Sequence, residues 1–208
     1  MKREKTGGRK AQALETKKKI YDTAYRLFKK HGIEKVSVDS IVEATGVSKG
    51  AFYVHFESKD ALIAAIIADF ITELDLDYKS YLQSFPDDTM ASDILISLAG
   101  KIGEILSVTI GYDLMKIAYE ILLSKTINTD IIVGYDRDIY KMFSEVISKG
   151  VRQGEFRTDI SPDEITKHCV MALRGLTYEW CIRYPDFDLK AQFLKHFEIL
   201  LPGIIKKQ

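Results

Sequence analysis

Hydrophobic residues recur at the spacing of an α-helix along most of this 208-residue chain. In the first clear case Ile20, Ala24 and Phe28 fall on one face, and Gly32 follows as a typical stop signal. The same pattern predicts further helices over residues 37–45, 48–56, 58–74, 89–108, 112–126, 130–153, 161–184 and 188–201. Neither a strand pattern nor an internal repeat emerges, so we predict an all-α protein of about nine helices.

Serines precede three of the early helices at the position that favours a capping side chain. Ser37, Ser48 and Ser58 each stand before an apolar helical pattern, where a serine oxygen can accept a backbone N–H. Gly46 separates the first two of these helices and leaves a turn of only two or three residues. Two short helices joined in this way predict a helix-turn-helix motif over 37–56, whose second helix would enter the major groove of DNA.

The stretch GVSKGAFYVHF in this motif combines rings typical of a core with residues typical of a contact surface. Phe52 and Phe56 lie four residues apart and are predicted to hold the second helix on the core. Lys49, Gly50 and Tyr53 would project outward. A glycine there lets the backbone approach a duplex closely, at a cost of about 1 kcal/mol in helix propensity. The ordinary alternatives are a solvated lysine and a packed tyrosine with its hydroxyl in water.

Charge is divided unevenly along the chain, although the formal net charge is zero. Residues 1–59 hold 14 Lys and Arg against 7 Asp and Glu, whereas residues 60–208 hold 16 against 23. A basic module joined to an acidic body favours a polyanionic partner such as nucleic acid. Part of the excess has another explanation, because the basic residues of segment 1–13 are expected to lie in a flexible terminal arm.

Composition and cysteine usage narrow the classes of protein to which this sequence can belong. The chain is 46% hydrophobic and 29% charged, as is usual for soluble globular proteins, and its apolar run at 61–68 is too short to cross a bilayer. A secretory signal is not apparent, so we expect a cytoplasmic protein without a membrane partner. Cys169 and Cys181 are too few for a disulfide framework and lack the neighbours of a metal site. Catalytic spacings and phosphate loops are also missing, which argues against an enzyme and predicts no cofactor or metal.

Over residues 14–74 the sequence resembles the TetR family of bacterial transcriptional regulators. The resemblance is dense through VSVDSIVEATGVSKGAFYVHFESKDAL at 36–62, where the family pattern reads AGVSKGTFYYHF followed by SKEEL. This chain departs from that pattern at Thr45, Ala51 and Val54, which stand where Ala, Thr and Tyr are usual. The spacing, the aromatic trio and the long capped helix together make the resemblance specific.

The resemblance implies a flexible basic arm over 1–13, a helix-turn-helix DNA-binding domain over 14–74, and a helical ligand-sensing and dimerisation domain over 75–208. It also implies sequence-specific binding to a double-stranded DNA operator, with repression as the commoner role in the family. The residues predicted to contact DNA are Ser37, Ser48, Lys49, Gly50, Ala51, Tyr53, His55 and Lys59. The two serines lie at helix N-termini that can meet a phosphate, and Lys59 would contact the DNA backbone without reading sequence.

The last two predicted helices are candidates for a dimer interface. Two such helices from each protomer would form a four-helix contact in a symmetric homodimer, as a palindromic operator requires. The predicted interface residues are Ala172, Gly175, Leu176, Trp180, Phe193 and Phe197. The same stripes also suit an intramolecular core, and part of each is expected to be core.

Aromatic residues and methionines recur at helical spacing in the middle of the chain, a pattern that is more often core than ligand pocket. If a cavity exists there, we expect it to take a small, largely apolar inducer, aromatic or acyl-chain in character. The candidate lining residues are Phe70, Tyr112, Met115, Tyr119, Met142 and Phe143.

We therefore expect a ligand-responsive repressor, in which the helix from Ser58 acts as a lever between the two domains. A DNA-binding regulator that is constitutive, or that is controlled by a protein partner, is the alternative. A solid core in the middle helices would favour that alternative.

Overall fold

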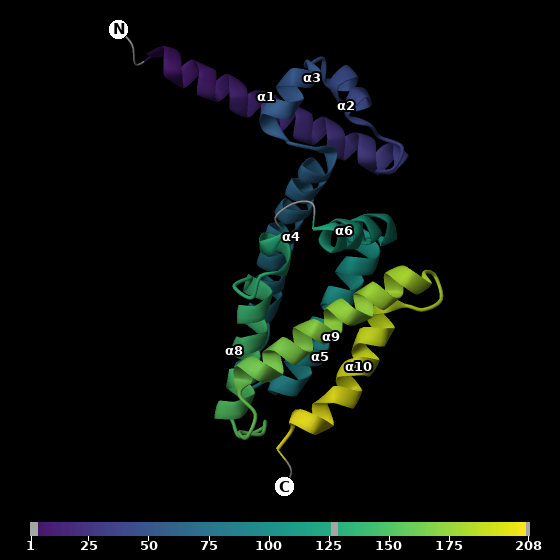
Figure 1. Cartoon of the computed structure of the whole chain (residues 1–208). Helices are drawn as coiled ribbons and strands as arrows, with labels where there is room; N and C mark the ends of the chain where they lie inside the picture. Colours follow the sequence, from purple (N-terminus) through teal and green to yellow (C-terminus); the bar gives the residue numbers. More distant parts are fainter. Residues whose placement is uncertain (1–3, 126–128, 207–208) are drawn as a thin grey trace.

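The computed structural model describes residues 4–125 and 129–206, and most of these residues are helical (Figure 1). The elements are α1 (Glu4–His31), α2 (Val38–Thr45), α3 (Lys49–His55), α4 (Lys59–Gln83), α5 (Ala91–Glu104), the π-helical segment η1 (Ile105–Ile110), α6 (Tyr112–Ser124), α7 (Asp130–Val133), α8 (Asp138–Arg152), α9 (Pro162–Arg183) and α10 (Leu189–Ile204). Across the described ranges β-structure is limited to one isolated antiparallel bridge between Phe156 and Ile205. The predicted all-α class is confirmed.

Helices α1, α2 and α3 form a three-helix unit at one end of the molecule, and α4 runs from it into the larger body (Figure 1). Glycines in the left-handed conformation set the turns of this unit, namely Gly32 (φ 79°) after α1 and Gly46 (φ 68°) after α2. The N–H of Gly46 donates to the carbonyl of Val42 at 2.9 Å. This bond ends α2, and the chain then turns within three residues into α3.

Serine side chains cap α2, α3 and α4 at the predicted positions. Ser48 and Ser58 each accept a hydrogen bond from the backbone N–H three residues on, at 3.1 and 3.0 Å. At α2 the cap is reciprocal, because Ser37 and Ser40 each accept the other's backbone N–H. Caps of this kind contribute about 1 kcal/mol each to helix stability.

Two hydrophobic cores lie along α4. The first joins the three-helix unit to the start of α4 around Phe52, which is fully buried. Ile117 and Ile121 of α6 belong to this same core, so the body packs directly onto the three-helix unit. The second core joins α5, α8, α9 and α10 around Phe143 and Phe193, both fully buried.

The start of α5 is capped from a distant part of the chain. Residues near its own N-terminus provide no side-chain cap. Instead, the carboxylate of Glu155, just after α8, accepts the N–H of Ala91 at 2.7 Å and the N–H of Ser92 at 2.9 Å. A carboxylate at a helix N-terminus also meets the positive end of the helix dipole.

Three element boundaries differ from those predicted. Helix α1 begins at Glu4, so residues 4–13 continue the helix where the sequence suggests an arm; alanine, glutamine and leucine, all good helix formers, follow at 11–14. The predicted helix over 130–153 is divided, because α7 ends at Gly134 and α8 begins at Asp138. The predicted helix over 89–108 is α-helical only as far as Glu104 and continues as the π-helical segment η1. After η1 the chain bends by 99° into α6.

Among the described residues, no single helix is both long enough and apolar enough to cross a membrane. The segment 91–110 and α6 reach that length and apolarity only as a pair, and the pair is sharply bent.

Replacing Gly103 with alanine is expected to lower the free energy of unfolding by about 1–3 kcal/mol, as overpacking typically does. A Cβ at this position of α5 would lie 2.7 Å from Cα of Lys190 in α10, which is closer than two such carbons approach. Gly203→Ala is the control, since a Cβ there has no atom within 4 Å. Urea unfolding measures both variants, and equal stability would contradict the close contact of α5 and α10.

Candidate functional site

The outer face of α3 presents the exposed residues of the helix-turn-helix motif. Phe52 and Phe56 are buried beneath it, with ring centroids 6.0 Å apart, and fix the helix to the core. Tyr53 is 48% exposed. Lys49 and Gly50 are exposed in the first turn of the helix. A helix held in this way offers its N-terminal half to the major groove of DNA.

Lys49 is paired across the motif with an acidic residue of α2. Its Nζ lies 2.7 Å from Oδ1 of Asp39, and this contact raises the pKa of Lys49. Both side chains are exposed, so the pair contributes little to stability and a phosphate can replace the carboxylate. The oxygens of Ser37 and Ser48 accept backbone N–H groups, which leaves each hydroxyl hydrogen free to donate to a phosphate.

Packing does not explain the glycine on this face. A Cβ added at Gly50 would meet only Oγ of Ser48, at 3.9 Å. The position therefore accepts a larger residue in the free protein. Ala51 and His55 are half-buried and lie four residues apart on the flank of α3, away from the fully exposed face.

Lys59 is predicted to contact a DNA phosphate, but in this structure its side chain bonds within the protein. Its Nζ donates to the carbonyl of Ile33 at 2.6 Å and lies 6.0 Å from the ring centroid of Phe28. Partial burial lowers the pKa of Lys59. In this structure the side chain ties the start of α4 to the segment between α1 and α2, and is not directed outward.

Val54 is an exposed residue of α3 that is not among the residues predicted to contact DNA. It is 79% exposed, beside Tyr53 and four residues after Gly50, and so belongs to the same outer face. An apolar side chain on such a face can contact the methyl group of thymine. The signal that identifies it is its helical spacing from Gly50.

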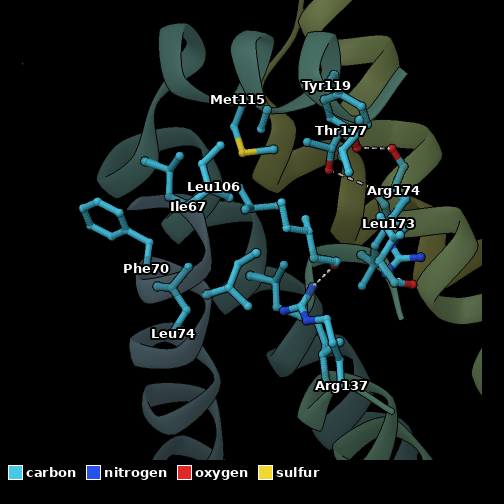
Figure 2. Close-up of a pocket in the computed structure, with 18 of the residues that line it drawn as sticks. Ile67, Phe70, Leu74, Leu106, Met115, Tyr119, Arg137, Leu173, Arg174 and Thr177 are labelled. Atoms are coloured by element: carbon cyan, nitrogen blue, oxygen red, sulfur yellow. Dashed lines mark hydrogen bonds between the residues drawn. The ribbon is translucent and has the colours of Figure 1, made fainter. Parts of the chain in front are cut away.

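A cavity of about 320 Å³ lies in the body, between α4, η1, α6 and α9 (Figure 2). Apolar side chains make up most of its wall. The lining residues are Ile67, Phe70, Ile71, Leu74, Tyr78, Ile102, Leu106, Ile110, Leu114, Met115, Ala118, Tyr119, Leu122, Leu123, Ile132, Val133, Arg137, Ile139, Val170, Leu173, Arg174 and Thr177. Of the predicted pocket residues, Phe70, Met115 and Tyr119 line this cavity.

The other three predicted pocket residues lie elsewhere. Tyr112 stacks on Tyr184 with ring centroids 4.1 Å apart. Phe143 is fully buried in the second core, next to Phe197. Met142 is also buried, beside a separate surface groove. None of these three residues is among those that line the cavity; Met142 and Phe143 are buried in the second core and Tyr112 packs against it.

Several polar groups at the cavity form bonds within the protein. The Tyr119 hydroxyl donates to the carbonyl of Arg174 at 2.7 Å, and the Thr177 hydroxyl donates to that of Leu173 at 2.7 Å. The guanidinium of Arg137 lies 3.0 Å from the carboxylate of Asp75. Burial raises the pKa of Asp75, although the neighbouring Arg137 opposes the shift.

Helix α6 connects the cavity to the three-helix unit. Met115 and Tyr119 face the cavity, whereas Ile117 and Ile121 are buried in the first core. Lys116, which stands between Met115 and Ile117, places its Nζ 2.9 Å from a carboxylate oxygen of Glu34, a residue just after α1. One helix thus contacts both the cavity and the motif-bearing unit.

The predicted dimer residues divide between core and surface. Trp180, Phe193 and Phe197 are buried within the chain's own second core, as expected for the part of each stripe that is intramolecular. Ala172 and Leu176 are half-buried, and Gly175 is exposed. The exposed apolar residues of the same two helices are Met171, Tyr178, Ile182 and Ile199.

The two cysteines are free thiols. Burial raises the pKa of Cys169 to about 12 and that of Cys181 to about 11, so both are protonated near neutral pH and are poor nucleophiles. Over the part of the chain that the structure describes, no cluster of three or more His, Cys, Asp or Glu could hold a metal ion.

Comparison with known proteins agrees with this geometry. A family profile described as "Bacterial regulatory proteins, tetR family" matches residues 20–66, which run from the second half of α1 through the first third of α4. The transcriptional regulator AcrR of Shigella flexneri is 27% identical over 204 residues, covering 92% of this chain and 90% of AcrR. The repressor KstR2 of Mycolicibacterium smegmatis is 23% identical over 203 residues, covering 95% of each protein.

Solved structures share the fold over the whole length. A TetR-family regulator from Pectobacterium atrosepticum has a TM-score of 0.76 at 21% identity, covering 95% of this chain and 97% of its own. The TetR-family repressor FadR of Thermus thermophilus, in complex with lauroyl-CoA, has a TM-score of 0.70 at 18% identity, covering 92% and 96%.

The relatives named here are transcriptional regulators and repressors, not enzymes. The helix-turn-helix geometry, the matching profile and the full-length relatives agree: residues 20–66 match the tetR family of bacterial regulatory proteins, and over its whole length the chain is similar to DNA-binding transcriptional regulators of that family.

Proposed function

We propose that this chain is a homodimeric transcriptional repressor that a small, largely apolar ligand releases from a palindromic operator. The observation that carries the proposal is the cavity of about 320 Å³. Two helices that line it, α4 and α6, also contribute to the core of the three-helix unit. A ligand in this cavity therefore touches the elements that position α3.

DNA would be read by the outer face of α3, within a DNA-binding domain over 14–74. Tyr53 and Val54 are the large exposed side chains of this face, and Gly50 allows the backbone to approach the duplex. Lys49 and the capped N-terminus at Ser48 would meet phosphates, which orient the helix without reading sequence.

The dimer would form through the exposed face of α9 and α10, within a second domain over 75–208. Met171, Gly175, Tyr178 and Ile182 follow one another at intervals of four, three and four residues, which places them on one stripe of α9. Ile199 adds a 69% exposed apolar side chain on α10. A two-fold contact through these helices would present two α3 helices to successive major grooves, about 34 Å apart.

Release would follow from a shift of α4 and α6. Packed helices respond to a filled cavity by moving as units between alternative arrangements, since close-packed cores do not deform continuously. The Lys116–Glu34 contact and the buried Ile117 pass such a shift to the three-helix unit. The ligand lowers operator affinity by the ratio of its affinities for the two arrangements.

The alternative is a regulator without a small-molecule inducer, which needs a filled core in the middle helices. The cavity supports the ligand-responsive form. FadR of Thermus thermophilus, which shares the fold, has been solved with lauroyl-CoA, a ligand with a long apolar chain.

Enrichment of random DNA duplexes by the purified protein is expected to yield a palindrome. The double variant Lys49→Ala, Tyr53→Ala should bind the recovered sequence at least about ten-fold more weakly, since each base or phosphate contact is worth about 1–3 kcal/mol. Lys79→Ala, an exposed lysine of α4, is the matched charge control and should bind normally. Equal binding by the double variant and the native protein would exclude the α3 face as the reader.

Gly50→Ala is expected to move stability and DNA affinity in opposite directions. The free protein should become more stable by up to about 1 kcal/mol, because alanine is the better helix former and its Cβ meets no close neighbour. Operator affinity should fall several-fold, because the methyl group holds the backbone away from the duplex. Thermal unfolding and a binding titration of one preparation measure both, and unchanged DNA affinity would show that no close backbone approach occurs.

The pair Ile182→Glu, Ile199→Glu is expected to convert the dimer into a folded monomer with much weaker operator binding. Both side chains are exposed in the single chain, at 60% and 69%, so the charges should not disturb its core. Leu76→Glu, on a residue of α4 that is 63% exposed, is the control and should remain dimeric. Light scattering after gel filtration distinguishes the two states, and a dimeric double variant would place the interface elsewhere.

A further inference from the structure

Two arginines stand at one end of an otherwise apolar cavity. Figure 2 shows Arg137 entering from the end opposite Met115 and Tyr119, with its guanidinium turned toward the aliphatic side chains. Arg174 lines the same cavity from α9. The hydroxyls of Tyr119 and Thr177 already donate to backbone carbonyls, whereas the two arginines and Tyr78 bring further donors to the wall of this cavity.

Arg137 has a donor that the protein does not use. One terminal nitrogen donates to the carbonyl of Ile132 at 2.9 Å, and the other donates to Asp75 at 3.0 Å. Its Nε is buried, and among the described residues nothing accepts its hydrogen. A buried donor without an acceptor costs about 1–3 kcal/mol, and more when the group is charged. An acceptor atom that reached this part of the cavity wall would satisfy that donor.

Arg174 adds a second positive charge beside the first. It donates to the carbonyl of Val133 at 3.1 Å and lies over the ring of Tyr140, with Cζ 5.3 Å from the centroid. Burial lowers the pKa of Arg174, and the positive charge of Arg137 adds to this shift. The two guanidinium groups lie near each other, because the carbonyls that they bond belong to the consecutive residues Ile132 and Val133.

The charges at this end of the cavity do not balance. Among the described residues, Asp75 is the buried carboxylate that pairs there, against two guanidinium groups. The neighbouring Asp138 and Lys141 lie 2.7 Å apart and neutralise each other. Arg174 is half-buried and, in the part of the chain that the structure describes, forms no ion pair with a carboxylate, whereas a charge removed from water is stabilised by a counter-ion.

We propose that the ligand of this cavity is an amphipathic carboxylic acid, with its carboxylate on Arg137 and Arg174 and its hydrocarbon part among the residues of α4, η1 and α6. A carboxylate supplies an acceptor for the free Nε of Arg137 and cancels the excess charge. Ile67, Leu106 and Met115 then surround the hydrocarbon part (Figure 2). The inference rests on the proposed function only in taking the cavity as the ligand site.

Calorimetric titration of the full-length protein with decanoate and decan-1-ol tests the inference. The two probes share one chain length, and at neutral pH the acid is ionised. We expect decanoate to bind about ten-fold or more tightly, as charge-assisted hydrogen bonds typically provide. Equal affinities, tighter binding of the alcohol, or no binding of decanoate would overturn the inference.

Two variants assign the head-group preference to the arginine pair. Asp75→Asn removes the carboxylate that competes for Arg137, so it should raise decanoate affinity several-fold and leave decan-1-ol unchanged. The double variant Asp75→Leu, Arg137→Met removes this ion pair as a unit, so neither of its partners is left buried without the other. It should lose most of the preference for the acid while circular dichroism shows an unchanged helical fold. A preference that survives in a folded double variant, or that falls in Asp75→Asn, contradicts the assignment.

Operator binding is measured separately in the presence of each probe. If decanoate binds with the expected preference but leaves operator affinity unchanged, the ligand class stands and the proposed release mechanism fails. If decan-1-ol releases the operator as well as decanoate does, the release mechanism stands and the carboxylate assignment fails.

Discussion

The three-helix unit and the body share one hydrophobic core, and this shared packing constrains the rest of the molecule. Ile66 and Ile67 of α4, and Ile117 and Ile121 of α6, are buried in it together with Phe52 of α3. The recognition face is therefore not an independent module on a flexible tether. Its orientation is fixed by the two helices that also enclose the cavity, so any change in cavity content has a direct mechanical route to the DNA-facing surface.

The helix-turn-helix could be predicted from sequence because its signals are local. Ser48 caps α3, which begins one residue later. Gly46, two residues before Ser48, adopts the left-handed conformation at the turn between the two helices. Phe52 and Phe56 define the buried face by their spacing alone. Each signal acts over a few residues, so one sequence contains all the information that this part of the fold requires.

Features that depend on distant partners could not be predicted in this way. Lys59 bonds to a carbonyl 26 residues earlier, which turns a predicted DNA contact into an internal tie. Glu155 caps a helix that begins 64 residues before it. A hydrophobic residue is likewise predicted to be buried, but the sequence does not show which atoms it packs against. Phe143 in a solid core and Phe70 beside a cavity therefore give the same signal in sequence.

The π-helical segment η1 leads directly into the bend that precedes α6. In it the N–H of Gly111 reaches back five residues to the carbonyl of Leu106, at 3.1 Å, so the turn holds one residue more than an α-helical turn. Along a helix, a shift of one residue corresponds to a rotation of about 100°, so an alignment of α6 that is wrong by one residue pairs different faces of the helix. When two relatives differ by one residue here, the alignment gap belongs inside 105–110. A gap placed after α6 would pair cavity-facing positions of one regulator with solvent-facing positions of the other, and would hide any shared ligand specificity.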